Sequence, residues 1–208
     1  YCPKDFIIGQ SNLFIQKIKM KLKTKVLNSR KLIFSDILLS PLISILLGSF
    51  LIAILAQISI PIPFSPVPIT GQTIGIVIVG VILGPWNGAL AVISYIFEGA
   101  LGLPVFANFS SGFHVIIGPT AGYIWSFILG AILIGLLDRL GLTSNFILSF
   151  LSCLTVTTFI LIFGAMYLAV YQGSLKSALT MGFYPFLIGD FVKSFLSALI
   201  IVGFKKFR

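Results

Sequence analysis

The sequence predicts an all-α membrane protein with six transmembrane helices. Hydrophobic residues make up 58% of the 208 positions and charged residues only 9%, whereas a soluble domain carries about 25% charged residues because water must wet its surface. Apolar runs recur from residue 37 to the end of the chain, and the longer ones meet the roughly 20 residues that a bilayer core requires. With a mean hydropathy of +1.12, a soluble protein with a large core is the disfavoured alternative.

Residues 1–34 are predicted to be a basic cytoplasmic leader, separate from a membrane domain of residues 35–208. Eight of the fourteen basic residues fall in this leader. Between residues 17 and 25 the lysines alternate with mostly apolar residues, and this period of two favours a flexible arm on anionic lipid over an amphipathic helix. Basic residues that flank apolar spans indicate membrane orientation rather than nucleic-acid binding.

The first three spans are predicted at residues 37–60, at residues 70–83 and in a segment that ends near residue 101. Four prolines between residues 61 and 68 forbid a helix between the first span and the second. The second span is short, and its glycines at positions 71, 75, 80 and 84 would let neighbouring helices approach closely. Residues 85–88, Pro-Trp-Asn-Gly, are expected to form a tight turn into the third span.

Residues 102–120 are predicted to be the longest non-helical stretch between spans. The fourth span follows to about residue 137, residues 138–139 form a polar loop, and the last two spans cover residues 145–170 and 184–204. Six spans place both termini on one side of the membrane, together with twelve basic residues, while Lys176 lies in an outer loop. The positive-inside rule therefore assigns both termini to the cytoplasm of a multi-pass protein in the cell membrane.

The candidate binding residues are polar groups at membrane depth. Asp190 and Lys193 lie three residues apart on one face of the sixth span, and ionisable residues there usually mark a ligand or ion path. The alternative is a pair that only neutralises itself and holds helices together. Asn108 offers an amide donor and acceptor in the long outer loop, and Gln72 enters the membrane where a buried amide needs partners. Tyr95 is a weaker candidate, for which packing is the favoured role.

Two further residues keep open interpretations. Glu98, near the outer end of the third span, is compatible with an interfacial position, a pair with a base or a ligand role. His114 is the single histidine, and a lone loop histidine is more often solvated than a ligand. The sequence has no phosphate-binding Gly-x-x-x-x-Gly-Lys-Ser/Thr loop and no cluster of Cys and His. We therefore expect no catalytic residues, no metal and no cofactor, and an intramembrane enzyme is disfavoured.

Several linked motifs carry a resemblance to a known family. They are PFSPVPITGQT at residues 63–73, GLPVF at 102–106, GPTAGY at 118–123 and DFVK at 190–193. Together they resemble the BioY family, the biotin-binding S components of energy-coupling factor (ECF) transporters. The likeness runs from about residue 40 to the C-terminus and excludes the basic leader.

The resemblance implies a six-helix S-component fold that captures biotin from the outer side and releases it inward. It implies three kinds of partner besides biotin: a transmembrane coupling subunit, two ABC-type ATPases and membrane lipid, with no nucleic acid. By the same likeness, Asp190 and Asn108 would hold the ureido ring of biotin and Lys193 its valerate carboxylate, with Gln72 and Tyr95 as weaker assignments. The alternative function is a self-sufficient, ion-coupled carrier for a small vitamin-like carboxylate.

Overall fold

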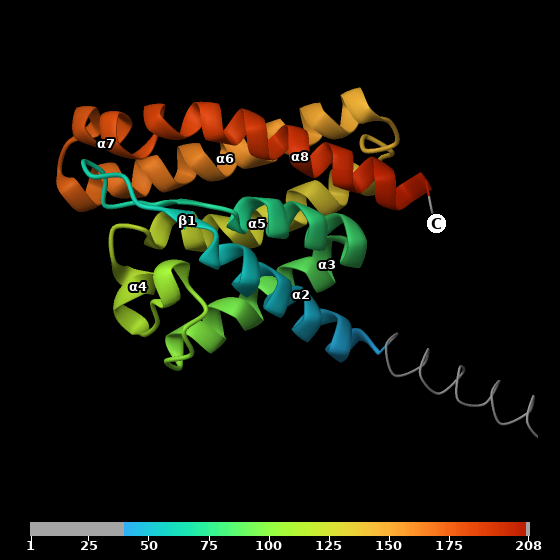
Figure 1. The fold of residues 1–208 in the computed structure, drawn as a ribbon, viewed down its shortest axis with the longest axis horizontal. Coiled ribbons are helices and arrows are strands. Elements are labelled where there is room, and N and C mark those ends of the chain that lie inside the picture. The colour runs from blue at the N-terminus through green and yellow to red at the C-terminus, as the bar shows by residue number, and fades with distance from the viewer. Residues whose placement is uncertain (1–39, 207–208) are drawn as a thin grey trace, which may run out of the picture. The chain divides into compact units, whose positions relative to one another are not determined.

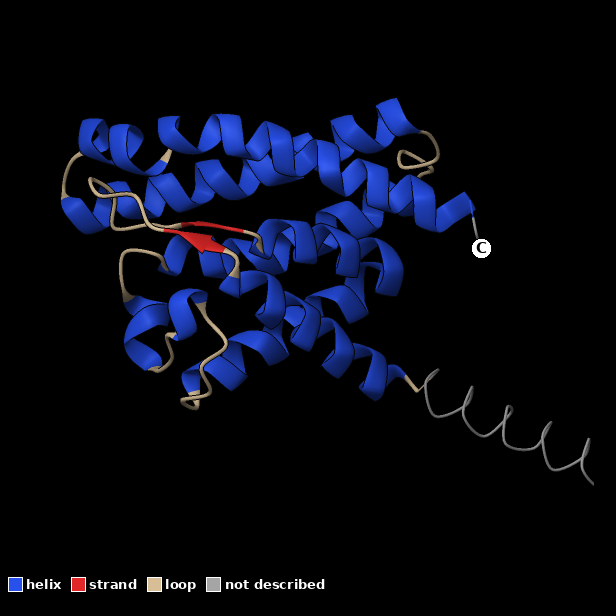
Figure 2. Cartoon of the chain, viewed as in Figure 1, coloured by secondary structure: helices blue, strands red, loops and turns tan. Residues whose placement is uncertain are grey.

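The computed structural model describes residues 40–206, and the predicted leader of residues 1–34 lies outside this part of the chain. The helices dominate, and the strands form one short antiparallel pair (Figure 2). In chain order the elements are α2 Pro41–Gln57, β1 Ser59–Ile60, β2 Ile69–Thr70, α3 Gln72–Ala100, η1 Ala107–Phe109, α4 Phe113–Ile117, α5 Ala121–Arg139, α6 Phe146–Gln172, α7 Leu175–Gly182, η2 Tyr184–Phe186 and α8 Leu187–Lys206.

The chain forms two units, Tyr1–Ile43 and Ser44–Arg208. In the described part of the first unit, Ser40 precedes α2, and its hydroxyl accepts a hydrogen bond from the Ile43 N–H (3.4 Å). Pro41 follows at the first helical position, where a missing N–H costs nothing. Apart from this first turn of α2, every feature below belongs to the second unit.

The six predicted spans are present in the described residues as α2, the two halves of α3, α5, α6 and α8. Helix α3 is interrupted at Gly84, whose φ of 79° and ψ of 175° suit glycine alone. Pro85 then begins the second half, so residues 85–88 form its first turn rather than the separate tight turn expected from the sequence. Helices α3, α5 and α6 and the segment Leu175–Lys206 are each long and apolar enough to cross a membrane.

The connections contain more helix than the sequence predicted. Residues 102–120 include η1 and α4, and α7 lies between the last two spans. These helices are shorter than the roughly 11–18 residues over which a 3.6-residue hydrophobic period is usually read. Helix α7 is capped locally, because the Ser174 hydroxyl accepts from the Ser177 N–H (3.3 Å). Asp138 and Arg139, predicted as a loop, belong to the last turn of α5.

The helices of the second unit pack in the order α3, α5, α6, α8, and α6 and α8 lie side by side in Figure 1. Glycines bring α3 and α5 together, as the sequence predicted for the second span. A Cβ atom at Gly80 would lie 2.4 Å from the Ile134 side chain, and one at Gly135 would lie 2.5 Å from the Pro85 nitrogen. The two helices are therefore in backbone contact.

Large apolar side chains cover much of the outer surface. Phe50, Val170 and Ile188 are 62%, 84% and 81% exposed, and they come from α2, α6 and α8. So many exposed large apolar side chains are unfavourable in water and favourable against lipid tails. The exposed surface confirms the predicted membrane class.

A polar cluster joins α5 and α8 at their C-terminal ends. Lys205 donates to the Asp138 carboxylate and to the Thr143 hydroxyl (2.6 Å), and Thr143 also donates to Asp138. Since α5 begins at Ala121, Asp138 and this cluster lie about 26 Å from the start of that helix. The positive-inside rule predicts that this end of the bundle faces the cytoplasm, which the structure does not test.

The close approach of α3 and α5 can be tested with Gly135→Ala. We expect this change to lower the free energy of unfolding by about 1–3 kcal/mol, because the new Cβ would meet the Pro85 nitrogen at 2.5 Å and the Gly80 carbonyl oxygen at 2.9 Å. Gly203→Ala in α8 is the matched control, since its Cβ would meet nothing within 4 Å and alanine favours helix. Thermal midpoints in one detergent measure both changes. An undiminished midpoint in Gly135→Ala would contradict the backbone contact.

Candidate functional site

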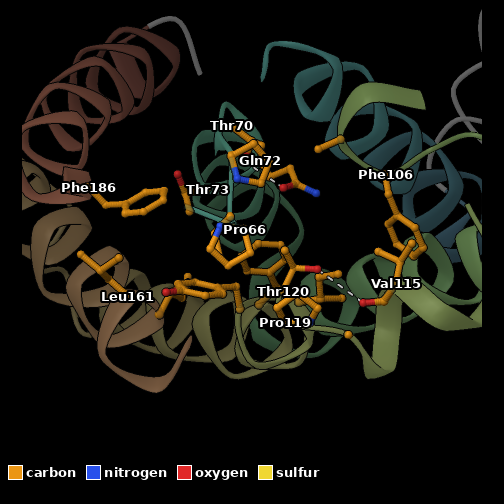
Figure 3. Close-up of a pocket in the computed structure, with 18 of the residues that line it drawn as sticks. Pro66, Thr70, Gln72, Thr73, Phe106, Val115, Pro119, Thr120, Leu161 and Phe186 are labelled. Carbon is orange, nitrogen blue, oxygen red and sulfur yellow. Dashed lines mark hydrogen bonds between the residues drawn. The ribbon is translucent and has the colours of Figure 1, made fainter. Parts of the chain in front are cut away.

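A cavity of about 340 Å³ lies among the starts of α3, α5 and α8, the middle of α6 and residues of the 66–70 and 106–120 segments. Phe186 and Leu161 lie on one side of it, and Phe106 and Val115 lie on the other (Figure 3). Apolar walls with a small number of polar groups are typical of sites that bind small molecules. The cavity lies at the start of α5, opposite the Asp138–Lys205 cluster.

Asp190 is the buried acid of the cavity. It lies in the first turn of α8 and is only 4% exposed. The Thr158 hydroxyl of α6 donates a hydrogen bond to its Oδ2 atom (3.0 Å). A carboxylate has about four acceptor positions, so Asp190 keeps acceptor capacity for N–H groups of a ligand in the cavity.

Lys193 is the base of the same cavity, one turn further along α8. Its Nζ atom donates weakly to the Thr70 carbonyl (3.5 Å). In the described part of the chain the ion pair is that of Lys205 with Asp138, and Asp190 and Lys193 form none. The two charges interact electrostatically without an ion pair, so each side chain can also contact a ligand, and the alternative that they only neutralise each other stays open.

Gln72 and Tyr95 occupy different positions relative to the cavity. Gln72 lines it, accepting from the Thr70 hydroxyl (2.8 Å) and donating to the Tyr95 hydroxyl (2.5 Å). Tyr95 is fully buried behind Gln72, with its ring edge-on to Phe106 at 5.4 Å between centroids, and is not on the cavity wall. Tyr95 thus orients Gln72, while a direct contact with ligand is not supported by its position.

Asn108 lines the cavity from the 106–110 turn. Its φ of 57° and ψ of 36° lie in the left-handed region, which asparagine enters more readily than most residues. His114 from α4 also lines the cavity but is an exposed residue.

Glu98, by contrast, does not line the cavity, and it accepts a hydrogen bond from the buried Ser49 hydroxyl of α2 (2.7 Å). The partner of Glu98 in the described residues is therefore a serine hydroxyl and not a base, a structural role that none of the three interpretations named.

Three polar residues of the site were not predicted. Thr158 holds Asp190. Thr73 lines the cavity at the start of α3, is 8% exposed, and has a hydroxyl without a hydrogen-bond partner among the described residues. Tyr123 also lines the cavity, and its hydroxyl donates to the Gly182 carbonyl (2.6 Å). The signal that was available is the Thr157–Thr158 pair inside an otherwise apolar run.

The arrangement suits reversible binding of a small, partly apolar anion with N–H donors. The apolar walls can bury a compact body, the Asp190 carboxylate can accept N–H groups, and the Lys193 ammonium can hold an anionic end. In the described residues no group of three or more His, Cys, Asp and Glu could hold a metal ion.

Comparisons with known proteins point to the same family as the motifs. Residues 23–208 match the BioY family. A protein named biotin transporter BioY from Thermotoga maritima is 39% identical over 159 residues, which cover 76% of this chain and 93% of that one. A probable biotin transporter BioY from Pyrococcus horikoshii is 38% identical over 145 residues, covering 70% and 83%. A crystal structure of the S-component for biotin from an ECF-type ABC transporter superposes with a TM-score of 0.66 at 29% identity, covering 80% and 90%.

Proposed function

The chain belongs to the BioY family, and from this membership we propose that it is the substrate-binding S component of an ECF transporter for biotin. The chain is a multi-pass protein of the cell membrane. The observation that carries the proposal is the cavity in which Asp190 and Lys193 lie one turn apart without an ion pair. Biotin offers matching chemistry, with two ureido N–H donors, a strong carbonyl acceptor, an apolar bicyclic body and a terminal carboxylate.

Asp190 and Asn108 are assigned to the ureido ring. The carboxylate of Asp190 accepts the ureido N–H groups, and the amide of Asn108 can donate to the ureido carbonyl. Gln72 already uses its amide on Thr70 and Tyr95, so it shapes the wall more than it binds. The apolar walls then enclose the bicyclic body.

Lys193 is assigned to the valerate carboxylate, with help from the start of α3. Its Nζ lies against the Thr70 carbonyl, two residues before α3 begins. The first N–H groups of a helix lack partners within it, and its N-terminus attracts negative charge. The unpartnered hydroxyl of Thr73 supplies one more donor at this place. A cation, a helix start and a hydroxyl together suit a carboxylate.

The family membership supports transport rather than catalysis, and the energy for uptake is assigned to partner subunits. We place a transmembrane coupling subunit and two ABC-type ATPases beside this chain. With both termini in the cytoplasm, the cavity opens toward the outer side and biotin enters from there. The rival function, a self-sufficient ion-coupled carrier, requires biotin uptake in cells that lack every ABC-type ATPase and loss of that uptake when the ion gradient is collapsed.

The first experiment is purification of the full chain, followed by mass spectrometry of bound small molecules and titration with labelled biotin. We expect biotin to accompany the protein, or to bind after removal of the endogenous ligand, with one molecule per chain. A different small molecule at that stoichiometry, with no binding of added biotin, would overturn the substrate assignment.

Thr158→Val tests whether the threonine positions Asp190. Valine keeps the shape of the side chain but removes the hydroxyl that donates to Asp190 Oδ2 (3.0 Å), so we expect biotin affinity to fall by about three- to tenfold. Thr155→Val is the matched control on α6, because Thr155 is exposed and donates only to the Leu151 carbonyl of its own helix. Equal affinities for the wild-type and Thr158→Val proteins would show that Asp190 needs no support from Thr158.

A further inference from the structure

Gln57, the last residue of α2, attaches a distant loop to that helix. Its Nε2 atom donates to the carbonyls of Val105 (3.3 Å) and Phe106 (3.2 Å), and also to Ala53 of its own helix (3.1 Å). Its Oε1 atom accepts from the Phe109 N–H (3.0 Å). A single side-chain amide therefore uses both its donor and its acceptor on the 105–109 segment.

The segment that Gln57 holds has an unfavourable backbone conformation. Asn108 and Phe109 have φ angles of 57° and 55°, a region that L-residues avoid and that is exceptional for a bulky residue such as phenylalanine. Such conformations persist only where the surroundings fix them. The bond from the Phe106 N–H to the Ser110 carbonyl (3.1 Å) closes the turn internally, whereas the Gln57 bonds attach the turn to α2.

The turn carries part of the cavity wall, and Gln57 does not. Phe106, Ala107 and Asn108 line the cavity, while Gln57 lies outside it. Any influence of Gln57 on a ligand must therefore pass through the turn. Asn108 and Phe109 are the two non-glycine residues with positive φ in the described part of the chain. Because this backbone conformation is unfavourable, the φ angles of the turn would relax if the Gln57 bonds were removed.

We propose that Gln57 is a positioning residue, which holds the 106–110 turn so that the Asn108 amide faces the bound ligand. The inference rests on the proposed function, since it takes biotin as the ligand and Asn108 as one of its contacts. It adds that the end of α2 determines the geometry of the cavity wall that carries Asn108. Weaker attachment of the turn should release biotin faster and leave the Asp190 end unchanged.

A double-mutant cycle tests the proposal on the full-length chain. Gln57→Ala and Asn108→Ala are each expected to weaken biotin binding by about tenfold, the size of one lost hydrogen bond. If Gln57 acts through Asn108, the double variant should bind about as well as Asn108→Ala alone. A merely structural role of Gln57 would instead multiply the two losses, and that result would overturn the inference, as would wild-type affinity in Gln57→Ala.

Two further proteins keep the test decisive. Gln57→Met fills similar space without hydrogen bonds, so it replaces Gln57→Ala in the cycle if the alanine protein does not fold. Gln172→Ala is the matched control, because Gln172 is exposed at the end of α6, bonds only to Ser177 and Met181, and lies outside the cavity. Failure of the wild-type chain to bind biotin would reject the proposed function itself, whereas normal wild-type binding with an additive cycle rejects only the role of Gln57.

Discussion

Asp190→Asn is expected to weaken biotin binding by about a hundredfold, or about 3 kcal/mol. Asp190 is 4% exposed and lines the cavity, so bulk water does not compete for its oxygens. Asparagine replaces one acceptor with an NH₂ donor, and that donor must face either the Thr158 hydroxyl, which already donates, or the N–H groups of the ureido ring. Titration of the purified variant with labelled biotin measures the loss.

The same substitution should not destabilise the empty protein. A buried charge at membrane depth costs free energy unless it is compensated, so we expect the ligand-free thermal midpoint of Asp190→Asn to equal or exceed that of the wild type. Added biotin should raise the midpoint of the wild type and barely change that of the variant. A variant that binds biotin normally would remove Asp190 from the site.

Asp138→Asn is the matched control for Asp190→Asn. It removes the same charge from the other end of the bundle, where Asp138 pairs with Lys205 and Thr143. We expect lower thermal stability, because the Lys205 ammonium loses its partner, and unchanged biotin affinity. Opposite signs of the stability effect in the two Asp→Asn proteins would separate a ligand-binding carboxylate from a structural one.

The spans could be predicted because hydrophobic length is a direct consequence of bilayer thickness. The break at Gly84–Pro85 was placed within a few residues, since glycine and proline limit helices through their own backbone chemistry. Helix α7 was not predicted, because its eight residues are fewer than the roughly 11–18 over which a helical period is usually read, and it packs against α6 and η2. The predicted leader of residues 1–34 and the cytoplasmic side of the termini stay predictions.

The charged part of the site could be predicted because Asp190 and Lys193 are rare residue types in an apolar span. Thr73, Thr158 and Gln57 were not predicted because threonine and glutamine are common residue types and carry no charge. Their roles arise only when α2, α3 and α6 bring them beside the cavity or its loops. Tyr95 was named as a weaker candidate for contact with the ligand. Nothing in the sequence indicated that its hydroxyl would instead contact Gln72 from within the core.

Lys193→Met is expected to weaken the binding of biotin by about a hundredfold and to change the binding of biotin methyl ester by less than about threefold. The ester keeps the ureido ring and the bicyclic body but has no carboxylate, so it cannot use the cation beside Thr70 and the start of α3. The wild type should therefore prefer biotin strongly, and Lys193→Met should bind the two compounds almost equally.

Lys176→Met controls for the loss of one positive charge and should keep the wild-type preference. Lys176 lies on the exposed first turn of α7 and outside the cavity. Equal losses for biotin and its ester in Lys193→Met would mean that Lys193 supports the cavity wall or the ureido end, and the carboxylate would then have to be assigned to Thr73 and the N–H groups of α3.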